Sequence, residues 1–397
     1  MSPWIQRILP PDPPIAPMAF SRRPVVHRFW AVGLLAALVG FTLGFILWSW
    51  QQGVLPATES YPILQSWHAR VQILLFLGSF LLGFALQSGP HVIGGQPPPA
   101  QPLLHLLSGL WLGFVVSLLD GWGMAIGNTL ISVAYLGAVI FLWRITQGGD
   151  PLRRLPRGIP LTVSFLPLAL APWLTLADPT VVLWVLWCGP VTSALVAGQQ
   201  LIQNVLGGTL LRGGWARLFA LALLVAWLLS TLATFTAWAT WPVAAVAWLV
   251  VLGLFVAGTD LVPAAWRFGL AAISVTLVLG LLFALIAAFW LVWALPPDGA
   301  VHLLGAGMLT TLILGVVARV VRFFSGTVAL NDRLLCYVLL VWGGVVLARV
   351  GTTLGWSFPE GGLLAVLGMG GMIVLGWSGR IALCLWRISR KITPELR

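Results

Sequence analysis

Charged residues are scarce in this sequence. Asp, Glu, Lys and Arg together make up only 8% of its 397 residues, whereas hydrophobic residues make up 59%. A water-soluble domain carries about 25% charged residues, because its surface has to be hydrated. The low charge content and the mean hydropathy of +1.00 exclude an ordinary soluble fold. They predict a protein that lies within a membrane.

Cysteine is also rare, and Cys188, Cys336 and Cys384 stand far apart inside apolar runs. This spacing excludes a disulfide framework and a CxxC site, and it predicts buried thiols. A Walker loop, a dinucleotide fingerprint, paired carboxylates and a nucleophile–base pair are absent too. No catalytic residue can therefore be named from the sequence, and enzyme activity is left open.

What the sequence does contain is a series of apolar runs long enough to cross a bilayer. A spanning helix needs about 20 apolar residues, and Gly and Pro are tolerated within it. Such runs occur near residues 30–50, 64–86, 103–119, 124–143, 159–177, 180–200, 216–238, 241–258, 268–295, 301–321, 334–354 and 362–385. The pattern predicts an all-α polytopic membrane protein with about twelve transmembrane helices.

These runs divide the chain into three parts. A Pro-rich stretch over residues 1–29 has the composition of a disordered cytoplasmic tail and lacks a signal-peptide pattern. The membrane domain is expected over residues 30–386. A short basic tail, also cytoplasmic, is expected over residues 387–397.

The net charge of +11 is explained by where the basic residues lie. If both termini are cytoplasmic, nineteen of the 21 Lys and Arg residues fall in the tails or in loops on the cytoplasmic side. The opposite loops contain acidic but no basic residues, namely Glu59, Asp120, Asp178, Asp298 and Glu360. This distribution follows the positive-inside rule. It makes the lipid bilayer the expected partner, and it gives no reason to expect nucleic-acid binding.

Arg70 and Arg349 are the two exceptions, and each lies near the outer end of a predicted helix. His68 and His302 lie at the same level. With a rise of ~1.5 Å per residue, all four fall within roughly 10 Å of one membrane boundary. Neutral imidazole is the commonest metal ligand and haem iron takes axial histidines. Arginine, in turn, suits the carboxylates of haem propionates.

Two interpretations of this layer stay open. In the first, His68 and His302 bind haem or another metal, and Arg70 and Arg349 bind the propionates. Gln72, one turn after His68 on the same helical face, would then support the ligand. In the second, the histidines reach lipid headgroups and the arginines pair with acidic residues of the outer loops.

The segments around the two histidines also carry a family resemblance. The first reads Trp67-His68-Ala69-Arg70 and continues through Gly-containing apolar sequence to a Pro-rich loop. The second, "HLLGAGMLTTLILGVVARVVRFFSG", runs from His302 through small residues to Arg319. In these features the sequence resembles the NnrS family, multi-spanning bacterial membrane proteins that contain haem and copper and are associated with nitric-oxide stress and denitrification. The resemblance implies a haem cofactor, a bacterial inner membrane location, a nitric-oxide role, and a redox partner or membrane complex.

The sequence departs from the family pattern at three places. Arg70 replaces the second histidine of the W-H-x-H motif, and Gln199 or Gln200 stands where the family has an arginine. The later G-H-T-G-R motif is reduced to "FFSG", without its histidine. These losses remove up to two candidate ligands. They mark a divergent member, argue against a copper site, and leave a single haem held by His68 and His302.

The sequence bears on three other functions. An oxygen-reducing haem-copper oxidase subunit is excluded, because the predicted helices 180–200 and 216–238 contain no histidine. A degenerate, non-catalytic accessory or scaffold subunit stays open, since ligands have been lost. A transporter of a small apolar solute also stays open. Ion-coupled transport is weakly supported, because few polar residues lie near the middle of the predicted helices.

Overall fold

The computed structural model contains helices and turns, and no strand, in the part of the chain that it describes. That part comprises residues 25–56, 59–96, 100–119, 121–236, 238–269, 271–325 and 331–392. Residues 1–24 and 393–397 of the two predicted tails lie outside it, as does Asp120. Because α2 begins at Val25 and α19 continues to Ile392, the described parts of both predicted tails are helical.

The first half of the chain is a series of helical elements. In chain order its elements are α2 (Val25–Gln51), α3 (Tyr61–Arg70), η1 (Val71–Leu77), α4 (Gly78–Ile93), α5 (Ala100–Val116), α6 (Trp122–Gly148), α7 (Pro151–Arg153), η2 (Arg154–Gly158), α8 (Ile159–Val163), α9 (Leu166–Leu170), η3 (Ala171–Trp173), α10 (Pro179–Leu186), η4 (Trp187–Val191) and α11 (Thr192–Leu206). The π-helical segments η1 and η4 continue their neighbouring α-helices, so that Tyr61–Leu86 and Pro179–Leu206 each form one long apolar span.

The second half is built in the same way. Its elements are α12 (Gly213–Phe235), η5 (Trp238–Thr240), α13 (Trp241–Gly258), α14 (Leu261–Phe268), α15 (Ala272–Val292), α16 (Pro297–His302), η6 (Leu303–Leu309), α17 (Thr310–Ser325), α18 (Asp332–Thr353) and α19 (Glu360–Ile392). The π-helical η6 joins α16 to α17, and together they form the span Pro297–Val321.

Within the described residues, 10 helices are long and apolar enough to cross a membrane. They correspond to ten of the twelve predicted spans. The predicted span 103–119 coincides with a shorter apolar helix, Gln101–Val116, and the predicted span 159–177 is broken into α8, α9 and η3. The chain is therefore an all-α, multi-pass membrane protein.

The broken segment runs back along α6. Near the end of α6, the side chain of Thr146 lies against Gly158, and earlier on α6 the Ser132 hydroxyl donates to the carbonyl of Ala169. These two points on α6 are ~21 Å apart, which is most of the hydrocarbon thickness. Proline removes a backbone donor and interrupts a helix. This segment contains three prolines, Pro160, Pro167 and Pro172.

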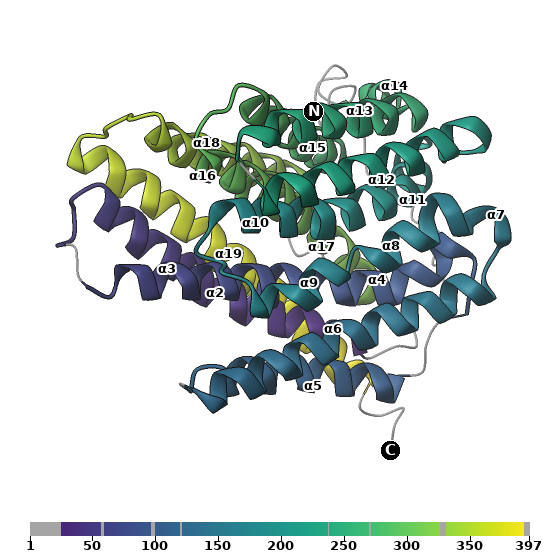
Figure 1. The fold of residues 1–397 in the computed structure, drawn as a ribbon, viewed down its shortest axis with the longest axis horizontal. Coiled ribbons are helices and arrows are strands. Elements are labelled where there is room, and N and C mark those ends of the chain that lie inside the picture. Colours follow the sequence, from purple (N-terminus) through teal and green to yellow (C-terminus); the bar gives the residue numbers. More distant parts are fainter. Residues whose placement is uncertain are drawn as a thin grey trace.

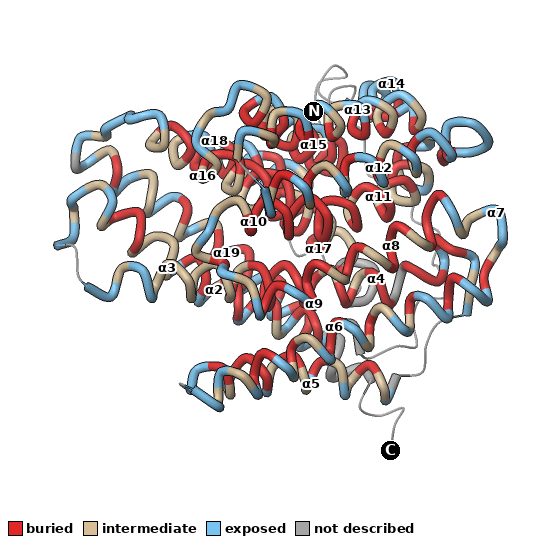
Figure 2. The backbone as a smooth tube through the Cα atoms, in the orientation of Figure 1, coloured by how far each residue is buried: buried red, intermediate tan, exposed pale blue. Residues whose placement is uncertain are grey.

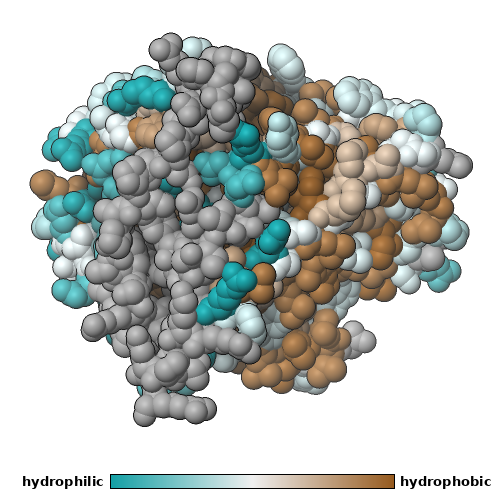
Figure 3. Space-filling model, turned by 180° about the vertical axis from the view of Figure 1, so that it is seen from behind, coloured by the Kyte–Doolittle hydropathy of each residue, from teal (hydrophilic) through white to brown (hydrophobic). Residues whose placement is uncertain are grey.

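Burial separates a central helix from peripheral ones. In the most hydrophobic stretch of the α10–α11 span, 83% of the residues are buried, whereas in that of α12 only 28% are buried. Figure 2 shows buried residues gathered around α10, α11 and α17. The exposed residues of α12 form an apolar stripe at helical spacing, Leu218, Leu221, Leu224, Val225, Leu228 and Leu232. Figure 3 shows a broad apolar patch on the face seen from behind, as expected for a surface in contact with lipid tails.

The long helices run roughly parallel to the horizontal axis of Figure 1. The turns between α2 and α3, between α5 and α6, and between α18 and α19 lie at its left end, whereas α7 lies at its right end. The left end carries α3 and α16, which bear the two candidate histidines. We call it the histidine end. We call the opposite end, with the arginines of α7 and η2, the arginine end.

Candidate functional site

A cavity of about 180 Å³ lies between α2, α3, η1, α10, α16, η6 and α18 at the histidine end. Four of the five predicted site residues line it: His68, Gln72, His302 and Arg349. The other polar side chains in its wall are Gln51, Tyr61, Gln65, Asp298 and Thr310. The structure thus brings together residues from the second, tenth and eleventh predicted spans.

The ring of His68 is held by α2. Its Nδ1 lies 2.8 Å from the carbonyl oxygen of Gly40. Because a carbonyl oxygen only accepts, Nδ1 carries the proton and Nε2 of the neutral ring keeps its lone pair. One turn along α2, Gly44 allows the ring to approach, since a Cβ there would lie 2.7 Å from Cε1 of His68.

Gln72 uses the same surface of α2. A Cβ at Gly40 would lie 2.9 Å from the side-chain amide of Gln72. Gly40 and Gly44 are one turn apart, as are His68 and Gln72, so a glycine face of one helix meets a polar face of the other. In the sequence this contact corresponds to the spacing Gly40-Phe-Thr-Leu-Gly44, which is not among the residues predicted for the site.

The ring of His302 is held within its own helix. Its Nδ1 lies 2.8 Å from the carbonyl oxygen of Asp298 and 3.4 Å from Oδ1 of the same residue. Nε2 of the neutral ring is again the nitrogen that is left with a lone pair. Both histidines therefore have the tautomer that metal-ligating histidines adopt when a backbone carbonyl or carboxylate holds the other nitrogen.

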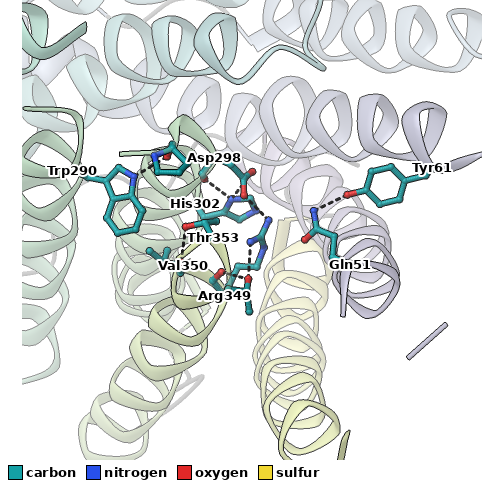
Figure 4. A network of polar contacts seen from close by, with 10 residues as sticks. Gln51, Tyr61, Trp290, Asp298, His302, Arg349, Val350 and Thr353 are labelled. Atoms are coloured by element: carbon teal, nitrogen blue, oxygen red, sulfur yellow. Dashed lines mark hydrogen bonds and ion pairs between the residues drawn. The ribbon is translucent and has the colours of Figure 1, made fainter. Parts of the chain in front are cut away.

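Arg349 forms an ion pair at the edge of the cavity. Its Nη2 lies 2.8 Å from Oδ2 of Asp298, and its Nη1 donates to Oγ1 of Thr352 at 3.2 Å. The Arg349 side chain is 13% exposed and that of Asp298 is 40% exposed. Figure 4 shows Asp298 between His302 and Arg349, with the Gln51–Tyr61 hydrogen bond nearby. For Arg349, pairing with an acidic residue of the loops predicted to lie outside is thus what the structure shows.

The turn that leads into α16 is also fixed. The indole nitrogen of Trp290 on α15 donates to the carbonyl of Pro296 at 2.8 Å. Gly299 packs against the same indole, since a Cβ there would lie 2.4 Å from it. Together with the Asp298–Arg349 pair to α18, these contacts place His302 from two sides.

The structure places Arg70 away from the cavity. Its Nη2 donates to Oδ1 of Asn128 on α6 at 2.5 Å, and Arg70 is not among the residues that line the cavity. The reason is helical geometry. An α-helix turns about 100° per residue, so side chains two positions apart point in directions that differ by about 160°. His68 and Arg70 therefore cannot face the same site, whereas His68 and Gln72 can.

The charges around the cavity are balanced. His68 lies within electrostatic reach of His302, Asp298 and Arg349, and Asp298 and Arg349 compensate each other through their ion pair. The cavity therefore carries no uncompensated charge from Asp298 or Arg349.

Each histidine precedes a π-helical segment of seven residues. Residues Val71–Leu77 follow His68 within one turn, and Leu303–Leu309 follow His302 directly. π-Helical turns are rare and occur frequently at functional sites. Both candidate histidines are thus followed by a π-helical segment of the same length, and this feature could not be predicted from the amino-acid pattern.

Other candidate ligands lie elsewhere. His91 and His105 are exposed, on α4 and α5, and neither lines the cavity. Cys188, Cys336 and Cys384 are buried. Within the described ranges, no group of three or more His, Cys, Asp or Glu side chains could hold a metal ion.

Comparison with known proteins identifies the family. No curated protein matches this sequence significantly. A family model described as NnrS protein matches residues 24–394, which is nearly the whole chain. The match includes the described residues of every span, together with all five residues predicted for the site. The chain therefore belongs to the NnrS family.

Proposed function

We propose that this protein is a haem-binding membrane protein of the NnrS family in which His68 and His302 would hold the haem iron. The observation that carries this proposal is the pair of imidazoles in one cavity, each with Nδ1 bonded to a backbone carbonyl. A haem would supply redox chemistry there. Because the family that the sequence resembles is associated with nitric-oxide stress and denitrification, we propose that the protein acts in the response to nitric oxide.

The number of protein ligands favours haem over a bare metal ion. Two imidazoles complete the coordination of haem iron, because the porphyrin occupies the other positions. A bare zinc or copper ion usually takes three or four protein ligands. The described residues do not bring three such side chains together. The donor set therefore fits haem.

The chain's own residues would orient and enclose the cofactor. The carbonyls of Gly40 and Asp298 hold the two rings in place, and the ion pair of Asp298 with Arg349 joins α16 to α18. Arg349 is the one predicted propionate partner that lies at the cavity. Its guanidinium already forms an ion pair with Asp298, so a propionate would have to bind the same guanidinium beside that carboxylate.

The size of the cavity adds a requirement. A volume of about 180 Å³ lies below the ~300–1,000 Å³ of pockets that hold drug-sized ligands. A porphyrin therefore fits only if side chains of the wall move. Among the polar wall residues that have no part in the proposed binding of the haem, Gln51, Tyr61 and Gln65 are exposed or half-buried, and we expect these to turn outward when the cofactor binds.

The orientation of the site is part of the same proposal. Loops rich in arginine lie at the end opposite to the cavity, and the positive-inside rule assigns that end to the cytoplasm. We therefore propose a bacterial inner membrane protein with both termini cytoplasmic and the histidine end outside. A redox partner or a membrane complex would then meet the cofactor from the outer side.

An optical spectrum tests the ligand assignment. Protein purified after expression with ample haem is expected to show a Soret band, and His68→Ala and His302→Ala are each expected to shift or abolish it. His105→Ala is the matched control, because His105 is exposed on α5 and does not line the cavity. An unchanged band in both ligand variants, or no haem in the wild type, would refute the proposal.

A further inference from the structure

Arg157 is a buried cation at the arginine end. It lies in the π-helical segment η2 and is only 3% exposed. Its Nε donates to Oε1 of Gln199 at 3.4 Å, and its Nη2 donates to the carbonyl of Leu211 at 3.1 Å. Both partners are neutral, so neither compensates its charge.

The charged groups around Arg157 increase the imbalance. Arg153 and Arg212 repel it, and Asp150 is the acidic residue that attracts it. Asp150, however, is bound to Arg153 at 3.1 Å. Burial and the two arginines lower the pKa of Arg157 to about 10, so it stays protonated at neutral pH. Arg157 thus has two arginines and one carboxylate in its surroundings, and that carboxylate is already paired with Arg153.

Buried hydrogen-bond donors at this place lack acceptors. Gln199 is fully buried, and its Nε2 has no partner while its Oε1 is held by Arg157. Arg154, on the same short helix, has a buried Nε without an acceptor. An unsatisfied buried donor destabilises the folded protein, and a negatively charged oxygen would satisfy the donors and the charge together.

We propose that Arg157 and Gln199, with Arg154 and Arg212 beside them, bind a phosphate oxyanion. This ligand chemistry occurs in the headgroups of anionic phospholipids and in free phosphate. Basic pockets between helices on the side of the basic loops are typical sites for anionic headgroups. The site lies at the other end of the molecule from the histidine cavity. This proposal therefore does not depend on haem binding.

Thermal unfolding of the whole protein in nanodiscs tests the site and identifies the source of the phosphate. In one arm, phosphatidylglycerol replaces phosphatidylcholine stepwise. In the other, inorganic phosphate replaces chloride at constant ionic strength in phosphatidylcholine discs. Ligand binding is expected to raise the Tm of the wild type saturably, by about 2 °C or more, in one of the two arms. The arm that responds shows whether the phosphate comes from a lipid or from solution.

Two variants distinguish the site from a general effect of charge. Arg157→Gln is expected to abolish the rise in Tm. Arg217→Gln removes an exposed arginine of the neighbouring α12, and this variant is expected to show the same rise in Tm as the wild type. Should Arg157→Gln fail to fold, Gln199→Leu is expected to raise the half-saturating ligand concentration about fivefold, by loss of roughly one hydrogen bond. No rise in either arm, an equal rise in Arg157→Gln, or an unchanged midpoint in Gln199→Leu would overturn the proposal.

Discussion

Two arginines, one at each end of the helical bundle, have different surroundings, although Arg157 is buried and Arg349 is only 13% exposed. Arg349 at the histidine end is paired with the carboxylate of Asp298, whereas Arg157 at the arginine end is bonded to a side-chain amide and a backbone carbonyl. A buried charge is costly unless it is paired. At the histidine end the protein supplies the counter-charge itself. The imidazoles of His68 and His302 are therefore the groups that are left to bind a ligand there. At the arginine end, the uncompensated charge of Arg157 is left to bind one.

The largest effect is expected when this difference is removed. Asp298→Asn leaves the largely shielded guanidinium of Arg349 without a carboxylate partner. Arg157 already has such surroundings, because it is bonded to neutral groups. Breaking a buried ion pair costs about 3–5 kcal/mol, but the partial exposure of Asp298 reduces this, and we expect a loss of about 2 kcal/mol in the free energy of unfolding. Thermal or chemical unfolding in detergent measures it.

A second substitution separates the lost pair from other effects of Asp298→Asn. Adding Arg349→Met removes the orphaned charge and is expected to recover part of the lost stability. If the double variant is less stable than Asp298→Asn, the ion pair is not the cause.

A smaller effect is expected from the packing around His68. In Gly44→Ala the new methyl group would lie 2.7 Å from Cε1 of the ring, so the ring must move. Supporting contacts of metal ligands typically change affinity by about 10–100-fold, and we expect haem binding to weaken at least about tenfold in a haem titration.

The matched control is Gly376→Ala on α19, where a Cβ meets no atom within 4 Å. This variant is expected to bind haem like the wild type. Equal haem affinity in Gly44→Ala and the wild type would contradict the role given to the face of α2.

The sequence was sufficient for the fold class and for four residues that the structure places at one cavity, because both depend on local patterns. Apolar runs of about 20 residues report membrane helices directly. Charges that violate the loop pattern pointed to Arg349 and to the level of His68 and His302. All three were then found at one cavity.

What the sequence did not reveal depends on contacts between distant segments. Gly40 and Gly44 belong to the site only because α2 packs against α3 and η1. The burial of Arg157 against Gln199 depends on the docking of η2 beside α11. The broken course of residues 159–173 reflects prolines whose effect depends on neighbouring helices. Spacing within a helix, however, already separated Arg70 from His68, and this geometric constraint was available without a structure.

The smallest effect is expected at Arg70, which tests that constraint. Because its guanidinium bonds to Asn128 on α6 and not to the cavity, Arg70→Gln is expected to leave the haem spectrum and the haem affinity unchanged. Arg349→Gln removes a cation at the cavity edge and is expected to weaken haem binding by about tenfold. Parallel haem titrations compare the two variants. If Arg70→Gln weakened binding as much as Arg349→Gln, the arginine facing α6 would have to reach the cofactor, and the separation of the two faces of α3 would be wrong.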